Sequence, residues 1–435
     1  MDMGVLAIIG LIALVVMLIL GVNIGFSMFI IGFIGYAVAM NFNSALGMLA
    51  TQTFAGSMKL SFTVIPLFIL MGQFAYHAGI SKGLFDAAQA WLGRTRGGAA
   101  MAAVVACALF GAICGSLPAT TATMAIIAMP EMRRRGYDDQ ISAGCIATAG
   151  TLGTLIPPST TFILYGIAAE VSIGRLFASG VVPGLILAAG FCIVVFVQGK
   201  IYPGRVPEGQ PYKIKDKFKS LIGLIPMVIL FGSSIGGMFA GVFSAMEAAG
   251  VGAFLALVIM IFMKQFTWEK FFAALRETVK STGMVLLIIV GANMFGYFLS
   301  ITRVAENLAA WVEGLALPAV VIMIIIVIIY AILGCFIDGA ALVILSTPIF
   351  LPIVKTLGYD PVWFGCMMVC VANLGSITPP IGMSCYVAAG VMKDVPLATI
   401  FKGIVPNILV YLIVMIGMAF VPGVVTWLPN LIYGG

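Results

Sequence analysis

Charged residues are scarce in this sequence. Asp, Glu, Lys and Arg make up 9% of its 435 residues, whereas hydrophobic residues make up 62%. A chain with so little charge cannot cover a compact fold with an aqueous surface, which excludes an ordinary soluble protein. Nucleic-acid binding is disfavoured as well, because no soluble domain is left to present the basic residues. The composition therefore predicts an all-α, polytopic membrane protein.

Histidine and catalytic motifs are also nearly absent. His77 is the only histidine, and its position after a long apolar run favours an interfacial role over a proton relay. The eight cysteines contain no C-x-x-C pair, so we interpret them as small apolar core residues rather than disulfides or metal ligands. The sequence contains no H-E-x-x-H motif and no paired aspartates in its apolar segments, and its two G-x-S-x-G matches, at residues 79–83 and 232–236, form no nucleophile elbow because no strand pattern precedes them. These absences argue against an intramembrane enzyme.

Each half of the chain contains one short interruption of its apolar sequence. The two interruptions read Thr151-Leu-Gly-Thr-Leu-Ile-Pro-Pro-Ser159 and Asn373-Leu-Gly-Ser-Ile-Thr-Pro-Pro-Ile381. Proline lacks an amide hydrogen and clashes with the preceding turn, so each interruption predicts a broken membrane helix. The residues expected to break the helices are Gly153, Pro157, Pro158, Gly375, Pro379 and Pro380. Irregular backbone at membrane depth commonly forms the ion and substrate sites of transporters.

The two interruptions belong to a longer internal repeat. A constant shift of 222 positions, obtained as 379 minus 157, superposes the two proline pairs. The same shift superposes Gly136-Tyr137-Asp138 on Gly358-Tyr359-Asp360. Duplicated halves are a common architecture of secondary transporters.

Basic residues indicate how the halves are threaded through the membrane. Arg94 and Arg96 precede the segment that begins at Gly97, and Arg133 to Arg135 follow it, so the positive-inside rule places both of its ends in the cytoplasm. Its small, polar middle, residues 115–122, predicts a re-entrant hairpin, and residues 334–341 are the equivalent turn. Alternate threading of the other helices leaves Lys59, Arg175, Arg303 and Lys355 outside. Both termini then face outward, and the second half is inverted relative to the first.

This threading divides the chain into seven segments. Mixed charged and apolar residues near 81–92 and 302–315 predict helical arms along the membrane interface. The segments are 1–96 (first scaffold helices and arm), 97–168 (first hairpin and broken helix), 169–198 (scaffold helix), 199–219 (cytoplasmic linker), 220–317 (second scaffold helices and arm), 318–391 (second hairpin and broken helix) and 392–435 (last helix and tail).

Several motifs occur in a specific order along nearly the whole chain. They include Pro130-Glu-Met-Arg-Arg-Arg-Gly-Tyr-Asp138, residues 150–159, Phe336-Ile-Asp-Gly339 and Ile377-Thr-Pro-Pro-Ile-Gly382. The ordered set resembles the large membrane subunit of tripartite ATP-independent periplasmic (TRAP) transporters, of the DctM and SiaM type. The resemblance implies a sodium-driven, elevator-type importer of organic acids in the bacterial inner membrane, with both termini periplasmic. It also implies a small four-helix membrane subunit and a periplasmic substrate-binding protein, with no cofactor besides the coupling ion.

Asp338 is the strongest candidate for a functional residue, because placing an unpaired carboxylate in an apolar region costs several kcal/mol of free energy. We expect it to face a cation, and a helix N-cap is the alternative role. By symmetry we expect two sodium sites made of carbonyl and hydroxyl oxygens. The first comprises Ser116, Thr120, Gly150, Thr151 and Thr154, and the second comprises Gly334, Asp338, Gly339, Ala372, Asn373, Ser376 and Thr378. The alternative for each hydroxyl is a hydrogen bond to the preceding turn.

No basic residue falls at mid-membrane depth in this topology, so we expect sodium to supply charge that neutralises an organic acid bound between the two hairpin turns. The exposed cations Arg303 and Lys355 are weak candidates for docking a periplasmic partner. A stand-alone sodium/dicarboxylate symporter is a second hypothesis, separable by its independence of a binding protein. A channel is a third, separable by the absence of counterflow.

Overall fold

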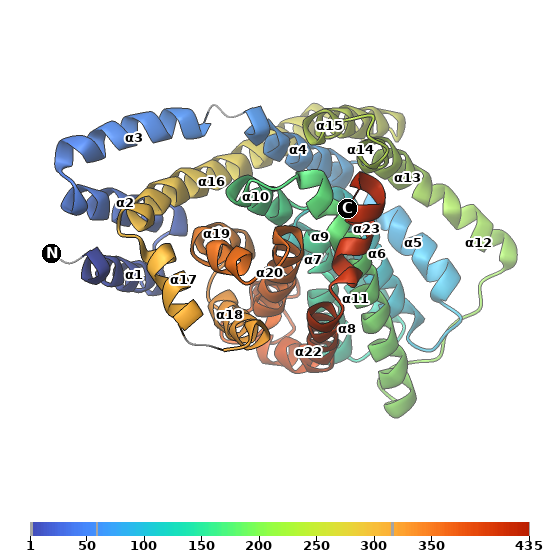
Figure 1. Cartoon of the computed structure of the whole chain (residues 1–435). Coiled ribbons are helices and arrows are strands. Elements are labelled where there is room, and N and C mark those ends of the chain that lie inside the picture. Colours follow the sequence, from blue (N-terminus) through green and yellow to red (C-terminus); the bar gives the residue numbers. More distant parts are fainter. Residues whose placement is uncertain (1–2, 58–59, 315–316, 435) are drawn as a thin grey trace.

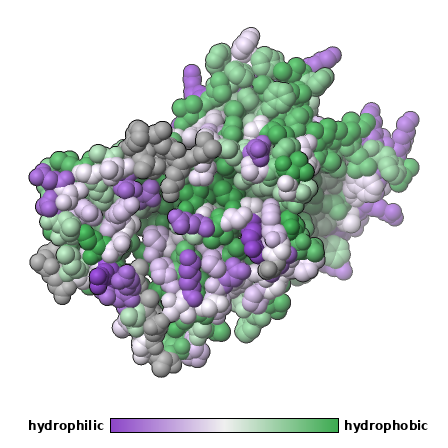
Figure 2. Space-filling view, turned by 45° about the horizontal axis from the view of Figure 1, so that its top comes forward, coloured by the Kyte–Doolittle hydropathy of each residue, from purple (hydrophilic) through white to green (hydrophobic). Residues whose placement is uncertain are grey.

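The computed structural model describes residues 3–57, 60–314 and 317–434, and every regular element in these ranges is a helix (Figure 1). Within them, six helices are long and apolar enough to cross a membrane, or eight if each of two bent helix pairs counts as one span. Figure 2 shows wide areas of hydrophobic surface on the visible face. One example is α18 (Ala319–Gly334), where Ile324, Ile328 and Ile332 follow one face and are each more than half exposed. Such a stripe suits contact with lipid rather than water.

The first half contains eleven α-helices. They are α1 (Met3–Ile19), α2 (Ile24–Ala39), α3 (Phe42–Ser57), α4 (Val64–His77), α5 (Ile80–Leu92), α6 (Gly98–Cys114), α7 (Leu117–Arg134), α8 (Asp139–Ala149), α9 (Leu152–Leu155), α10 (Thr160–Ala169) and α11 (Ile173–Ile201).

The second half continues with α12 (Ile214–Ser220), α13 (Ile225–Phe231), α14 (Gly237–Phe239), α15 (Ala245–Phe262), α16 (Trp268–Ile301), α17 (Val304–Gly314), α18, α19 (Gly339–Thr356), α20 (Pro361–Ile377), α21 (Met383–Val391), α22 (Leu397–Phe420) and α23 (Gly423–Tyr433). Short 3₁₀ and π turns join α12, α13 and α14.

The order of helices recurs at the shift of 222 positions. The second hairpin arms α7 and α19 begin at residues 117 and 339 and are both 18 residues long. The following helices α8 and α20 begin at residues 139 and 361, which is the same shift. By this shift α2 corresponds to α15, and α4 corresponds to the second part of α16. The relative orientation of the halves in the membrane stays a prediction.

The two halves interleave instead of forming separate lobes. Helix α16 packs along α2, and α15 packs along α4, so each of these pairs joins one helix from each half. The same holds for α22 against α8 and for α11 against α20. In Figure 1 the second-half helices α18 to α20 and α22 lie together beside the first-half helices α7 to α10. The polar segments of both halves are thereby brought to the middle of the molecule.

Three helix predictions were incomplete. Apolar runs in the sequence predict no helix at α3 or α23, and they predict only the apolar second part of α16. Polar residues lower the mean hydropathy of α3. One proline precedes α23 and another lies inside it, and prolines are unusual within helices. The first part of α16 carries several charges, so hydropathy detects only the apolar remainder. The linker expected at 199–219 and the tail expected after the last helix therefore each contain a helix, α12 and α23.

Candidate functional site

Each of the two helical hairpins, α6 with α7 and α18 with α19, has a tip where its second arm begins. Ser116 is the N-cap of α7 and Asp338 is the N-cap of α19, and these two positions are equivalent at the shift of 222. At the first tip, Gly115 has a φ of 62°, a conformation that glycine adopts without the strain of a side chain. The Gly115 carbonyl accepts a hydrogen bond from the Thr160 hydroxyl at 3.1 Å, which ties the tip to the start of α10.

Asp338 takes the capping role that the sequence offered as its alternative. Its Oδ2 accepts hydrogen bonds from the backbone amides of Ala340 at 3.1 Å and Ala341 at 3.4 Å. Among the described residues it forms no ion pair. Because the carboxylate also lines the central cavity described below, capping leaves it in a position to face a cation.

The helices are interrupted at both proline pairs, whereas Gly153 and Gly375, which were also expected to break them, lie inside α9 and α20. In the first half the break lies between α9 and α10, and the axis bends by 41°. In the second half it lies between α20 and α21. The Pro157–Pro158 and Pro379–Pro380 bonds are both cis. Ser159 caps the outgoing helix by accepting the amide of Phe162 at 3.3 Å.

Glycines let each hairpin approach its own break. In the first half Gly111 of α6 lies against Gly153, where an added Cβ would come within 2.5 Å of the Gly153 Cα. In the second half Gly375 lies against Gly334 of α18, where an added Cβ would come within 2.7 Å of the Gly334 Cα. Small residues permit such close backbone contact between membrane helices. The hairpin backbone is therefore held beside the residues that precede each break.

Hydrogen bonds join the two breaks to each other. The Thr154 hydroxyl lies 2.7 Å from the Asn373 Oδ1, and the Asn373 Nδ2 donates to the Thr151 carbonyl at 3.3 Å. A further hydrogen bond between the halves joins the hydroxyls of Thr121 and Ser384 at 3.0 Å. All five side chains are buried. Since these bonds connect residues from both halves, the two hairpins and two broken helices form one unit, which we call the hairpin unit.

A cavity of about 200 Å³ lies where both tips and both breaks converge. Its other wall comes from α4 and α16. No lysine, arginine or histidine is among the described residues that line it. The polar side chains in the lining are Gln73, Ser116, Thr154, Thr160, Thr161, Ser281, Asp338, Asn373 and Ser376.

The residues expected to bind sodium divide into two groups. Those that line the cavity are Ser116, Thr154, Asp338, Gly339, Ala372, Asn373 and Ser376. Those behind it are Thr120, Gly150, Thr151, Gly334 and Thr378.

The second group still lies near the first. Thr120 donates to the Ser116 carbonyl at 2.8 Å, and Gly334 lies beside Ala372. Thr151 instead directs its hydroxyl to Tyr411 of α22, away from the tip.

The hydroxyls of this set mostly bond to the preceding turn. Thr120, Thr151, Ser376 and Thr378 each donate to a carbonyl three or four residues earlier, whereas Thr154 donates to the Asn373 Oδ1. A hydroxyl that donates its proton in this way keeps oxygen lone pairs, which are the groups a hard cation needs. The two roles foreseen for these side chains are thus compatible.

Four of the polar residues that line this cavity were not predicted from the sequence. Gln73 and Ser281 lie on α4 and α16, and Thr160 and Thr161 begin α10. Gln73 carries the one available signal, since it is the only amide side chain in the apolar helix α4. The others resemble the hydroxyl residues found throughout the chain.

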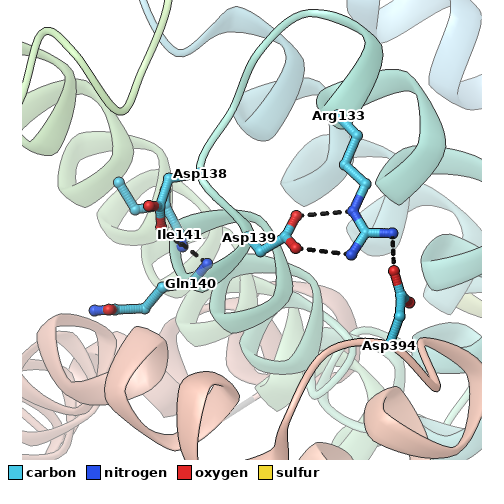
Figure 3. Close-up of polar contacts among 6 residues, drawn as sticks. All are labelled: Arg133, Asp138, Asp139, Gln140, Ile141 and Asp394. Carbon is cyan, nitrogen blue, oxygen red and sulfur yellow. Dashed lines mark hydrogen bonds and ion pairs between the residues drawn. The ribbon is translucent and has the colours of Figure 1, made fainter.

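An ion-pair cluster lies at the end of the hairpin unit predicted to face the cytoplasm (Figure 3). Arg133, in the last turn of α7, binds Asp139 through two hydrogen bonds of 2.7 and 2.8 Å and also pairs with Asp394, which follows α21. The hydrogen bond from Arg133 lowers the pKa of the Asp394 carboxyl. The base of the first hairpin is thereby linked to the exit of the second broken helix.

Comparisons with known proteins agree with this architecture. The family model of the "Tripartite ATP-independent periplasmic transporter, DctM component" matches residues 11–424. This chain belongs to that family. It is 35% identical over 387 residues to the C4-dicarboxylate TRAP transporter large permease protein DctM of Pseudomonas aeruginosa, covering 88% of this chain and 89% of the relative.

Two further proteins extend the comparison. The sialic acid TRAP transporter large permease protein SiaM of Vibrio cholerae is 29% identical over 420 residues, with 95% of this chain and 96% of the relative covered. The structure of the Alcanivorax borkumensis YdaH transporter superposes with a TM-score of 0.63 at 15% identity, over 88% of this chain and 90% of YdaH, and shows the fold alone. The chain is therefore a multi-pass membrane protein and a TRAP transporter permease, which is not a family of enzymes.

Proposed function

We propose that this TRAP permease imports a small organic acid together with sodium across the bacterial inner membrane. The observation that carries the proposal is the cavity in which both hairpin tips and both helix breaks meet. Relatives named for C4-dicarboxylate and for sialic acid support an organic acid as the substrate. At about 200 Å³ the cavity is smaller than the roughly 300 Å³ of a typical small-molecule pocket, which favours a small acid such as a C4-dicarboxylate.

Charge balance supports sodium as the co-substrate. The lining carries the carboxylate of Asp338 and no described cationic side chain, so an acid bound here would add negative charge to negative charge. Unneutralised charge at membrane depth costs several kcal/mol. Cations that enter with the acid remove this cost, and their binding then depends on the acid. This dependence would couple transport to the sodium gradient.

Each tip offers oxygen ligands of the type that sodium prefers. At the second tip, Asp338 lies with Asn373 and Ser376, and at the first tip Ser116 lies with Thr154. Carbonyl and hydroxyl oxygens of further residues complete the sets we propose, from Thr120, Gly150 and Thr151 at the first tip and from Gly334 and Thr378 at the second.

The two walls of the cavity support our proposal that the protein moves as an elevator. One wall belongs to the hairpin unit and the other to α4 and α16, so the substrate would lie between a moving body and a fixed scaffold. The hairpin unit comprises residues 97–168 and 318–391, and the remaining helices form the scaffold. The arms α5 and α17 precede the two hairpins and would act as their connections.

The partners follow from the family. We propose a small four-helix membrane subunit and a periplasmic binding protein that delivers the acid, with both termini of this chain periplasmic. Arg303 and Lys355 are exposed and thus available for docking. Lys355 is equivalent to Arg133 at the shift of 222 but, within the described residues, has no carboxylate partner.

The test is uptake of labelled carboxylates into proteoliposomes that hold this chain and its small subunit. Uptake should require both an inward sodium gradient and the periplasmic protein. Sodium-driven uptake without the periplasmic protein would support a stand-alone symporter and remove the docking role of Arg303 and Lys355. Uptake that is neither saturable nor capable of counterflow would indicate a channel.

A further inference from the structure

A second cavity lies apart from the transport site and shares no lining residue with it. It has a volume of about 530 Å³, opens to the surface and is lined by α5, by the end of α7 and by α12 with the chain just before it. Figure 1 shows α12 at the edge of the molecule, beside α5. By the predicted topology this region lies at the cytoplasmic surface of the membrane. The proposed function does not use it.

Solvent-exposed charged groups of both signs line the cavity. Arg134 and Arg135 are occupied, because both pair with Glu131, at 2.8 and 2.7 Å. By contrast, four lining side chains make no hydrogen bond or ion pair with any described residue. They are the cations Lys82 and Lys219 and the anions Asp86 and Asp216.

A buried amide also points to a ligand. Gln89 lines the cavity and is only 4% exposed, yet neither its Nε2 nor its Oε1 has a hydrogen-bond partner. A buried amide without a partner is destabilising, and native proteins rarely retain one. Because both atoms are shielded in this structure, the Gln89 side chain must turn toward the cavity to offer them to an occupant that accepts and donates hydrogen bonds.

The surface next to the cavity is apolar. Ile214, Phe218 and Ile222 are spaced four residues apart along one side of α12 and the turn after it, and they are 69%, 60% and 64% exposed. The Phe218 ring packs against Trp91 of α5, which donates through its Nε1 to the Lys217 carbonyl at 3.2 Å. A helix with an exposed apolar stripe and a lysine-rich opposite side lies in the interfacial plane of a membrane. Acyl chains would then run along the stripe while a headgroup enters the cavity.

We propose that this cavity binds the headgroup of a phospholipid that carries both a phosphate and a primary amine. Lys82 and Lys219 donate to the phosphate, and Asp86 and Asp216 accept from the ammonium group. The Gln89 amide serves either group. Since the walls come from an arm, from the first hairpin and from the linker between the halves, the bound lipid holds α12 against the hairpin base.

Native mass spectrometry of the full-length chain in detergent tests the proposal. The delipidated protein is titrated with phosphatidylethanolamine, phosphatidylglycerol, which lacks the amine, and phosphatidylcholine, whose methylated amine cannot donate hydrogen bonds. Phosphatidylethanolamine should bind about tenfold more tightly than either, as expected from charge-assisted hydrogen bonds. Equal affinity for the three lipids would overturn the proposal.

Variants locate the site. Lys219→Ala should weaken phosphatidylethanolamine binding about tenfold, whereas Lys215→Ala, on the same helix but outside the cavity, should leave it unchanged. Asp216→Asn should weaken phosphatidylethanolamine and not phosphatidylglycerol. Equal effects of Lys219→Ala and Lys215→Ala would contradict the site.

Two further measurements separate a ligand site from a structural defect and a lipid from a soluble ligand. Gln89→Leu should lose lipid binding while the lipid-free protein keeps or raises its melting temperature, because the unsatisfied amide is gone. A lower melting temperature with unchanged lipid binding would show that Gln89 is structural and overturn its role. Glycerophosphoethanolamine should compete only at far higher concentration than the lipid, and competition at equal concentration would overturn the lipid as occupant.

Discussion

Replacing Asp338 with asparagine separates its two roles. The carboxylate caps α19 by accepting the amides of Ala340 and Ala341, and it lines the central cavity. Asparagine is as good an N-cap as aspartate, so Asp338→Asn keeps the helix start and removes only the charge. Asp338→Ala removes both and should cost about 1 kcal/mol more in stability.

The size of the expected effect follows from the charge. Two unit charges about 4 Å apart interact by about 4 kcal/mol at an effective dielectric constant of 20. Loss of a third of that energy, about 1.4 kcal/mol, weakens binding tenfold. Asp338→Asn should therefore raise the sodium concentration for half-maximal uptake at least about tenfold, with a melting temperature within about 2 °C of the wild type.

The assay is sodium-dependent uptake into proteoliposomes, with Asp360→Asn as the matched control. Asp360 is the N-cap of α20 and accepts the amide of Val362 at 2.6 Å, but it does not line the cavity. The Asp360→Asn protein should keep the sodium dependence of the wild type. Unchanged sodium dependence in a well-folded Asp338→Asn protein, or an equal shift in the control, would refute the assignment.

Three other substitutions test the architecture around the site. Thr154→Val leaves the buried Oδ1 of Asn373 without its partner, so it should destabilise the protein by roughly 1–3 kcal/mol in thermal unfolding, while Thr154→Ser should restore it. Gly375→Ala inserts a Cβ between hairpin and break and should cost about 1–3 kcal/mol and most of the uptake, whereas Gly417→Ala, with open space around it, should be neutral or slightly stabilising. Arg133→Gln should lower the melting temperature slightly at pH 7. Arg133 lowers the pKa of its carboxylate partner Asp394. The difference in melting temperature between Arg133→Gln and the wild type should therefore shrink as the pH falls below about 4 and vanish below the lowered pKa of Asp394. Equal stability of Thr154→Val and wild type, of Gly375→Ala and Gly417→Ala, or a pH-independent Arg133→Gln difference would each contradict the corresponding contact.

The sequence predicts the breaks and tips well because their causes are local. A proline pair beside glycine interrupts a helix wherever it stands, so Pro157 and Pro379 could be placed without knowledge of the fold. The same is true of Asp338, since an aspartate before an apolar run suits an N-cap. The repeat then extends each local inference to the other half.

Contacts between the halves could not be predicted in this way. Whether Thr151 turns its hydroxyl to the tip or to Tyr411 depends on how α22 packs against α8, and no local pattern encodes that packing. Gln73 belongs to the cavity only because α4 forms the facing wall. Residues contributed by one helix to a site built on others are thus the ones that sequence reasoning misses.

The two tips share a position in the repeat but differ in charge, and this difference bears on coupling. Asp338 would hold a cation partly by a full negative charge, whereas Ser116, whose side chain makes no capping hydrogen bond, offers only dipoles. A sodium ion at the first tip would therefore be bound weakly until the acid arrives and supplies the missing negative charge. Such an ion cannot bind firmly without substrate, and the substrate cannot bind firmly without it, which is the condition for symport. Sodium binding measured without substrate should accordingly report the Asp338 tip alone, and adding the acid should reveal the second ion.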